Sequence, residues 1–352
     1  MSSINLEQAL RGSPSDKGEY LKSLRFMHRN LSKVVREVER HMIPGAGLSV
    51  TIVVGPTGVG KSTFAALEAE TLLKLYDVEV RENPGVIPVV LNEVDAADGK
   101  DINWRLFYRH LSEDLHALAP DFPGQTGPNG KPTDSLRNYR LTFEQALRFR
   151  QVRHLILDEA VHFVDSKTEP LQYGNLLKSL ANRTNLNLLL VGAYGSEKLV
   201  RASGQLARRI GVVHFPRYYE TQDDFDAFTQ FIKEFAMHIP LPFPVDLAKY
   251  VEPLFSAHLG MPGYAAKALI KAVVACAFDG SQSWKDEYVW NALPTTAEYE
   301  TVAFETLDGE ENVKPYLSSA HPITYPNEAE LLVSLAARKA QTSGYNQRGL
   351  RS

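Results

Sequence analysis

The residues with the most specific chemistry form the segment GPTGVGKST, Gly55 to Thr63. It fits the pattern G-x-x-x-x-G-K-[ST], in which glycines let backbone N–H groups turn inward around a phosphate. Lys61 is then expected to reach the β- and γ-phosphates, and the Ser62 hydroxyl to bind Mg²⁺. The nucleotide contacts predicted from this motif and the acidic motif below are Gly55, Pro56, Thr57, Gly58, Val59, Gly60, Lys61, Ser62, Thr63 and Asp158.

A second motif, HLILDEA, is an apolar run that ends in two acids, Asp158 and Glu159. After a phosphate loop, this pattern predicts that Asp158 binds Mg²⁺, directly or through water, and that Glu159 acts as the general base on the attacking water. The alternative is that both acids simply cap the next helix. No N-K-x-D sequence, the guanine-selecting motif, occurs in the chain, which favours ATP over GTP.

The elements that must position these residues alternate between strands and helices. Short apolar runs predict five strands, at Leu48–Val54, Val86–Leu91, His154–Asp158, Leu186–Gly192 and Val212–Phe215. Strands that are apolar throughout and separated by helical stretches indicate a parallel sheet covered on both faces. From Asp223 to Asp279 the pattern becomes helical, which predicts a small all-helical lid after the sheet.

The two ends of the chain give weaker signals. Residues 1–17 are polar and are expected to lack regular structure, whereas apolar spacing predicts one helix from Tyr20 to Met42. A further helix is predicted from Asn327 to Ala340. The predicted organisation is an N-terminal extension and helix at 1–45, an ATPase core at 46–220, a lid at 221–280 and a C-terminal extension at 281–352 that binds partners or is partly disordered.

Composition excludes several classes of protein. The 38 Lys+Arg against 42 Asp+Glu give a net charge of −4, which excludes a uniformly basic nucleic-acid coat protein but permits local basic patches. The single cysteine, Cys276, excludes a disulfide framework. No apolar run approaches the ~18 residues of a membrane span, and the N-terminus has no signal-peptide core. We therefore expect no membrane partner and a cytoplasmic location.

With these motifs in place, the chain resembles the AAA+ ATPases, and among them the TniB/TnsC family of transposition regulators, which is similar to MuB. The more specific matches are LDEAVHF, LANRTNLNLLLVG and QLARRIGVVHF, in that order. The resemblance implies a P-loop AAA+ three-layer α/β sandwich with a five-stranded parallel sheet and a helical lid. It also implies ATP bound between subunits of a homo-oligomeric ring or helical filament.

The resemblance also implies roles for residues outside the two motifs. Asn92 matches a polar switch that restrains Glu159, although it reads equally as a turn residue. Arg208 and Arg209 match the place of an arginine finger, and adjacent helical residues point about 100° apart, so one of them is expected to serve. The alternative is an ordinary surface pair. Where related proteins place a polar residue after the fourth strand, this chain reads Gly192-Ala193-Tyr194, so Tyr194 or Ser196 would have to substitute.

Two regions are candidates for binding DNA. Basic residues that include Arg25 and Arg29 recur at helical spacing in the predicted Tyr20–Met42 helix, where they form either a phosphate-tracking stripe or a solvated face. The resemblance places other DNA-facing residues in loops, at Lys100, Arg105 and Lys131. Contacts to phosphate alone give little sequence preference.

The function predicted from these features is an ATP-dependent, DNA-binding regulator of transposition. It is expected to assemble on double-stranded DNA, mark the target site, and recruit a transposase and target-selection subunits, with ATP hydrolysis driving disassembly. Two alternatives remain: another prokaryotic AAA+ ATPase of the helicase-loader or signalling type, and a metabolic P-loop kinase.

Overall fold

The structure is a computed structural model. It describes residues 4–43, 48–95, 102–115, 136–165, 186–202 and 209–317, together with residues 329 and 333. Within these ranges, no helix has both the length and the apolar character needed to cross a membrane.

A five-stranded parallel sheet forms the centre of the core, as the sequence predicts. Its strands are β1 (Val50–Val54), β2 (Val89–Glu93), β3 (His154–Asp158), β4 (Asn187–Gly192) and β5 (Ile210–His214), in the order β2-β3-β4-β1-β5. In the interior strand β1, Val53 pairs with Val191 of β4 on one side and with Val213 of β5 on the other. All of β1 and β3 is buried, which explains their continuous apolar sequences. Pro88 is tolerated because it precedes the edge strand β2.

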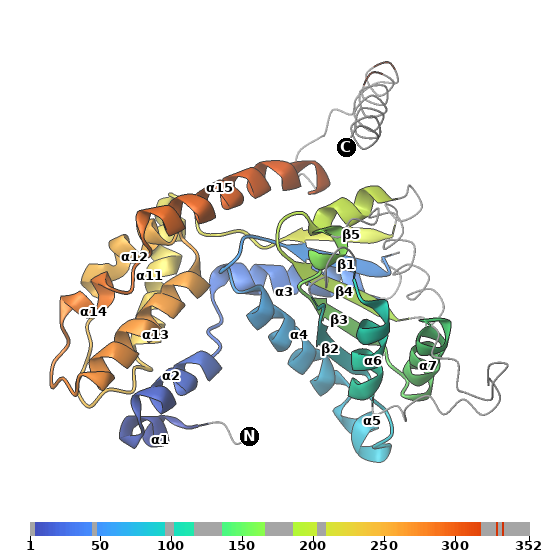
Figure 1. Cartoon of the computed structure of the whole chain (residues 1–352), viewed down its shortest axis with the longest axis horizontal. Coiled ribbons are helices and arrows are strands. Elements are labelled where there is room, and N and C mark those ends of the chain that lie inside the picture. The colour runs from blue at the N-terminus through green and yellow to red at the C-terminus, as the bar shows by residue number, and fades with distance from the viewer. Residues whose placement is uncertain are drawn as a thin grey trace, which may run out of the picture. The chain divides into compact units, whose positions relative to one another are not determined.

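Helices cover both faces of this sheet (Figure 1). On one face, α3 (Arg29–Met42) and α4 (Lys61–Leu75) bury side chains such as Leu31, Val38 and Phe64 against strand residues in a single apolar cluster. On the other lie α6 (Trp104–Asp114) and α7 (Leu136–Phe149), which pack against each other. The other core elements in the described ranges are short: α5 (Asp77–Glu82), α8 (His162–Asp165) and the 3-10 helix η1 (Ser196–Ala202).

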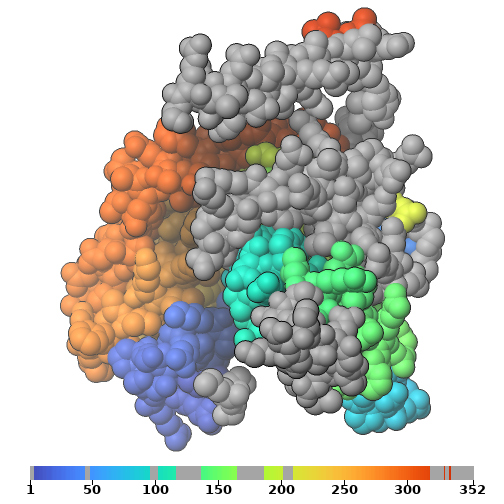
Figure 2. Space-filling view, turned by 45° about the vertical axis from the view of Figure 1, so that its right-hand side comes forward, coloured from blue at the N-terminus to red at the C-terminus, as the bar shows by residue number. Residues whose placement is uncertain are grey.

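The lid is helical, as predicted, but it includes the N-terminus. Its elements are α11 (Gln222–Ala236), the 3-10 helix η2 (Ala248–Tyr250), α12 (Val251–Ala257), α13 (Pro262–Phe278) and α14 (Asp286–Trp290). Two N-terminal helices, α1 (Leu6–Arg11) and α2 (Pro14–Ser23), join them, and α2 packs on α13. Figure 2 shows this N-terminal part, in blue, against the orange lid helices.

The prediction that residues 1–17 lack regular structure is therefore wrong. Capping boxes begin both helices, through Asn5 in α1 and Ser13 in α2. Lys17 is buried, and its ammonium group donates to the carbonyl oxygens of Ala9, at 2.6 Å, and Leu10, at 2.8 Å. Tertiary packing of short, capped helices explains what polar composition alone obscures.

The predicted single helix from Tyr20 to Met42 is also wrong. Helix α2 ends at Ser23 and α3 begins at Arg29, with extended backbone at Leu24 and His28 on either side of the break. The intervening chain places Phe26 against Phe231 and Phe235 of the lid, with ring centroids 5.9 and 5.6 Å apart. These contacts override a helical periodicity that continues in the sequence across the break.

Helix α15 (Thr296–Val313), followed by the 3-10 helix η3 (Lys314–Tyr316), is an element that the sequence pattern did not reveal. It contacts the core where β4 and β5 end. Glu310 forms an ion pair with Arg217 at 2.8 Å, and both side chains are largely buried. Gly309 lies so close to the Tyr194 ring that a Cβ there would come within 2.1 Å of it. The predicted Asn327–Ala340 helix lies outside the described residues except for 329 and 333.

Candidate nucleotide-binding site

The turn between β1 and α4 has the geometry that the glycines of GPTGVGKST allow. Gly58 and Gly60 have φ angles of 86° and 111°, in a region that side chains disfavour, and Gly60 is the N-cap of α4. A Cβ on Gly55 would lie 2.3 Å from the carbonyl oxygen of Phe215, so this position also requires glycine. The N-terminal end of α4 therefore lies at the loop, where backbone N–H groups and the helix dipole favour an anion.

Lys61 is buried at the start of α4, with only 8% of its surface exposed. Its ammonium group donates to the carbonyl oxygens of Gly55 and Pro56, each at 3.0 Å. Burial lowers the pKa of Lys61 to about 8, although the nearby Glu159 and Asp158 carboxylates oppose this shift. These two acids from β3 are thus close enough to act electrostatically on the phosphate-loop lysine.

The acidic pair lies at the carboxyl end of β3. Asp158 is the last residue of the strand, and its Oδ1 accepts a hydrogen bond from the backbone N–H of Glu159 at 2.8 Å. Glu159 has a φ of 55°, a left-handed conformation that costs energy for a residue with a side chain. The backbone N–H of the next residue, Ala160, donates to Val191 of β4 at 2.9 Å and helps to hold this turn.

A cavity of about 380 Å³ lies beside the loop and is lined by three parts of the chain. The phosphate loop contributes residues 57–63, and Glu159 lies on the same wall. The lid contributes Pro262, Ala266 and Lys267 of α13. The connection between α2 and α3 contributes Phe26 and His28, which sequence reasoning missed because it placed them within a continuous helix. The cavity thus combines the glycine-rich loop with apolar side chains from the lid and from the α2–α3 connection.

His28 is fixed by the residues that join core and lid. Its Nδ1 lies 3.0 Å from the Tyr218 hydroxyl, and burial lowers its pKa to about 4, so it is neutral at pH 7. The adjacent Arg29 forms an ion pair with Asp224 of α11 and donates to the carbonyl oxygen of Asp223 at 2.9 Å. The α2–α3 connection is therefore anchored on the lid at the edge of the cavity.

The first turn of α13 rests directly on the phosphate loop. The backbone N–H of Tyr264 donates to the carbonyl oxygen of Gly58 at 3.2 Å. A Cβ on Gly263 would lie 2.5 Å from that same oxygen. A Cβ on Gly58 would meet the Tyr264 ring at 2.5 Å. If the lid moves, the loop that would hold the phosphates must therefore either move with it or lose these contacts.

The structure does not bring every predicted residue to this site. Asn92, half-buried at the end of β2, donates from its amide to Asp114 of α6 at 2.5 Å. Arg209 is exposed in the turn before β5, and Arg208 lies outside the described residues. Of the two residues considered as polar substitutes after β4, Ser196 donates to the carbonyl oxygen of Ala193 at 2.9 Å. The other, Tyr194, has its hydroxyl 2.8 Å from His214 Nε2.

The predicted DNA-binding residues within the described ranges are Arg25, Arg29 and Arg105. The break between α2 and α3 divides the basic residues between separate elements, so the prediction of one continuous basic stripe along a single helix is wrong. Arg25 forms an ion pair with Glu70, and Arg29 with Asp224. Arg105 is exposed near the start of α6, while Lys100 and Lys131 lie outside the described residues.

Comparison with known proteins relates the core of this chain to AAA domains. Residues 46–200 match a family model described as "AAA domain". Among curated proteins, the chain is 23% identical over 221 residues to the ATP-binding cassette sub-family B member 6 of Xenopus tropicalis. That match covers 53% of this chain and only 25% of the relative, so the chain spans about a quarter of the length of that protein.

Three solved structures of similar fold illustrate the likeness. The ADP form of ORC2 from Aeropyrum pernix has a TM-score of 0.54 and 19% identity, covering 76% of this chain and 68% of that one. Aeropyrum pernix ORC1 in complex with DNA has a TM-score of 0.52 and 15% identity, covering 86% and 81%. Cdc6p from Pyrobaculum aerophilum has a TM-score of 0.51 and 13% identity, covering 76% and 68%. The fold is that of the AAA+ P-loop proteins.

Proposed function

We propose that this protein is a Mg²⁺-dependent AAA+ ATPase that assembles on double-stranded DNA and regulates transposition. The observation that carries the ATPase part is the convergence of Lys61 and Glu159 on one cavity closed by the lid. A nucleotide-binding fold alone requires no carboxylate beside the phosphate loop. Glu159, held in a left-handed conformation at that position, is suited to orient and deprotonate water.

The residues of the site fit a nucleoside triphosphate. On binding, the Lys61 ammonium group exchanges its two backbone carbonyl partners for phosphate oxygens, a stronger charge-assisted interaction. The glycines of the loop leave room for phosphate where a Cβ would intrude. Phe26 and Ala266 provide apolar surface for the base. Because GTP-selecting residues are absent from the sequence, ATP is the proposed nucleotide.

The same site fits Mg²⁺ as a shared ion. Asp158 at the end of β3 and Ser62 at the start of α4 offer oxygen ligands, and Mg²⁺ typically takes one or two protein ligands together with phosphates and water. When bound, the ion neutralises charge developing on the transferred phosphoryl group. The chain's own contribution is to hold both oxygen ligands beside Lys61 and to present Glu159 to water.

DNA binding and oligomerisation rest on resemblance and on the related structures. One structure of similar fold, the Aeropyrum pernix ORC1 protein, is in complex with DNA. One of Arg208 and Arg209, which precede β5, is the proposed arginine finger that would complete the site of a neighbouring subunit. Assembly on DNA would let weak phosphate contacts from many subunits add together. A transposase and target-selection subunits are the proposed partners of the assembled form.

Two variants test the ATPase proposal. Glu159→Gln should retain ATP binding but lower the rate of hydrolysis by about 10²- to 10⁴-fold, because it removes the general base. Glu93→Gln is the matched control, since Glu93 pairs with Asp158 across the sheet but does not line the cavity. Hydrolysis by Glu159→Gln at the wild-type rate would refute this role for the residue. Lys61→Ala should lose nucleotide binding itself.

Electron microscopy with duplex DNA tests the assembly proposal. Rings or filaments should form with ATP and DNA in the Glu159→Gln variant, which cannot hydrolyse ATP, and should fail to form in Lys61→Ala. Absence of nucleotide-dependent assemblies across salt concentrations and DNA lengths would refute assembly on DNA, even if ATP hydrolysis were intact.

A second candidate, a replication initiator or helicase loader, is favoured by the similarity to ORC and Cdc6 structures. The two functions differ in their partners. A transposition regulator should stimulate strand transfer by its transposase into the DNA that it coats, whereas an initiator should bind one preferred DNA sequence and load a helicase. Footprinting on random and defined DNA distinguishes the two.

A further inference from the structure

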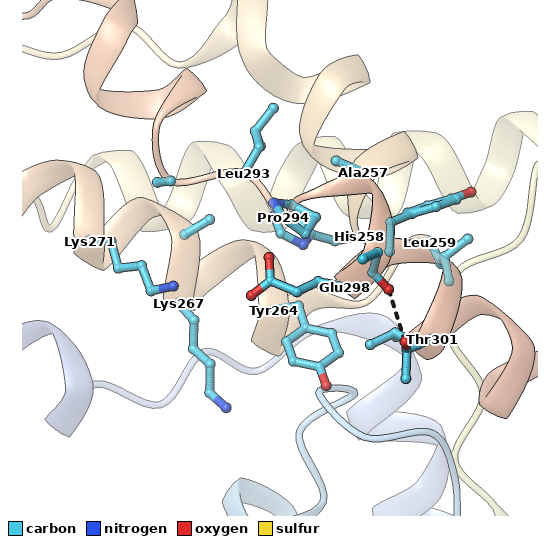
Figure 3. Close-up of a pocket in the computed structure, with 15 residues that line it drawn as sticks. Ala257, His258, Leu259, Tyr264, Lys267, Lys271, Leu293, Pro294, Glu298 and Thr301 are labelled. Atoms are coloured by element: carbon cyan, nitrogen blue, oxygen red, sulfur yellow. Dashed lines mark hydrogen bonds between the residues drawn. The ribbon is translucent and has the colours of Figure 1, made fainter.

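A second cavity, of about 530 Å³, lies between the lid and helix α15 (Figure 3). Its walls come from the end of α12, from one face of α13, and from the residues that lead into and begin α15. This volume lies within the range of ~300–1,000 Å³ that is typical of small-molecule sites. None of the residues assigned above to phosphate, Mg²⁺ or water activation lines it.

The floor of this cavity is apolar. Ala268 of α13, Leu293 and Pro294 before α15, and Val302 within α15 contribute carbon surface. Such a floor favours the body of an organic ligand over a hydrated inorganic ion.

One cation remains available at the centre of the cavity. Figure 3 shows Lys271 reaching toward the middle, beside Glu298, whereas Lys267 points away from it. Glu298 is already engaged at the start of α15, where its Oε2 accepts hydrogen bonds from the Thr295 backbone N–H and hydroxyl, each at 2.8 Å. Lys271 forms no ion pair or hydrogen bond within the described part of the chain. The hydrogen bonds from Thr295 lower the pKa of the Glu298 carboxyl, and Lys271 also acts on it electrostatically, lowering it further. The lining residues still carry two lysine charges, Lys267 and Lys271, against the one carboxylate of Glu298, so their net charge favours an anion.

A buried imidazole adds an independent observation. His258 lines the cavity with 8% of its surface exposed, and its Nε2 atom has no hydrogen-bond partner. Burial, together with the nearby Lys271 charge, lowers the pKa of His258 to about 4. A neutral, unsatisfied imidazole in an apolar wall costs free energy unless a ligand or water completes its hydrogen bonding.

Lys267 lines both this cavity and the nucleotide cavity, and Tyr264 connects this cavity to the phosphate loop. The Tyr264 ring abuts Gly58 of that loop. A ligand on one side of α13 therefore contacts the residues that border the phosphates on the other side. Two anions bound on opposite sides of α13 repel each other, so they should oppose each other's binding.

We propose that the cavity between α13 and α15 binds a small organic anion with a flat apolar body, and that this ligand and ATP weaken each other's binding. Lys271 pairs with the anionic group, and the apolar floor together with the neutral ring of His258 holds the body. The site itself is independent of the proposed function; only the antagonism with ATP rests on nucleotide binding at Lys61.

The fluorescent probe 8-anilinonaphthalene-1-sulfonate has this chemistry and tests the site on the full chain. Wild-type protein should bind it saturably with a stoichiometry of one. Ala297 is an exposed residue of α15 that lines the cavity, so Ala297→Phe adds a bulky ring there and should weaken binding by about tenfold or more, whereas Ala297→Ser should not. Equal binding by wild type and Ala297→Phe would overturn the proposal.

A charge variant and a competition experiment complete the test. Lys271→Met should weaken probe binding by about three- to fivefold, while Lys233→Met, which removes an exposed charge elsewhere on the lid, should leave it unchanged. Saturating ATP should weaken probe binding by about fivefold in wild type and not in Lys61→Ala. Probe binding unaffected by bound ATP would overturn the antagonism, whereas failure of ATP to bind at all would refute the nucleotide site and leave the cavity result standing.

Discussion

Gly309 lies in the middle of α15, where alanine would ordinarily stabilise the helix. Gly-to-Ala replacement in a helix interior gains about 1 kcal/mol from propensity. Here, however, the added Cβ would lie 2.1 Å from Cδ2, 2.3 Å from Cγ and 2.7 Å from Cβ of Tyr194. The Tyr194 ring cannot easily swing away, because its hydroxyl lies 2.8 Å from His214 Nε2 and its Cβ is itself part of the contact.

The clash should therefore outweigh the gain in helix propensity. Overpacking costs about 1–3 kcal/mol, and lifting α15 also strains the largely buried Arg217–Glu310 ion pair beside it. We expect Gly309→Ala to lower the local stability of α15 by about 1–2 kcal/mol. This corresponds to amide hydrogen exchange about 5- to 30-fold faster in the helix.

Hydrogen exchange followed by mass spectrometry measures α15 directly and does not require the whole chain to unfold in two states. The decisive control is Tyr194→Ala, which removes the ring that the new Cβ meets. In that background Gly309→Ala should slow exchange in α15, because only the propensity gain remains. Unchanged or slower exchange on introducing Gly309→Ala into the wild type would refute the close packing of α15 on Tyr194.

Three further predictions concern charge. Glu68 is 1% exposed, and burial, with a smaller effect from Glu39, raises its pKa to about 7. The folded chain holds the Glu68 proton more tightly than the unfolded chain does, so the free energy of unfolding falls as pH rises from about 4.5 to 7. Glu68→Gln should therefore raise the free energy of unfolding by up to about 3 kcal/mol at pH 8 but by much less at pH 4.5. An equal effect at both pH values in urea denaturation would contradict this prediction. The pKa of Lys61 is about 8, so its ammonium group loses its charge above that pH. The Kd for ATP should then rise by up to about tenfold per pH unit. A Kd that stays constant up to about pH 10 in calorimetric titrations would be inconsistent with this prediction. Arg105→Gln should weaken DNA binding and reduce the slope of log affinity against log salt concentration by about one. Arg25 already forms an ion pair with Glu70, so Arg25→Gln should change neither quantity. The reverse order of effects in fluorescence anisotropy would favour the N-terminal residues as the DNA contact.

The prediction of the sheet succeeded because each buried strand is a contiguous apolar run. The predicted strand at His154–Asp158 has the same bounds in the structure, and the others differ by a few residues at their ends. Likewise, the motif GPTGVGKST predicts a strand before it and a helix after it. Its turn needs positive φ angles at Gly58 and Gly60, which glycine adopts without help from distant contacts. Local chemistry of this kind is readable without knowledge of distant contacts.

The N-terminus was predicted less well because its structure depends on the lid. The periodicity of Leu21, Leu24 and Met27 indicates a continuous helix, yet Met27 is 51% exposed and the chain is extended on both sides of it. Contacts of Phe26 with lid aromatics outweigh the local preference. Helix α15 was missed for a related reason: its outer face exposes Phe304 and Leu307, so apolar residues do not mark a single side.

The sequence by itself determined the parallel sheet, the phosphate loop and the acidic pair after β3, because each is encoded by residues adjacent in the chain. Only the tertiary structure decided what surrounds them. It placed Phe26 and His28 at the nucleotide cavity, rested Tyr264 on Gly58, and paired Arg25 and Arg29 with carboxylates. These arrangements depend on surfaces that meet only when segments far apart in sequence pack together, and short-range periodicity carries no information about which surfaces those are.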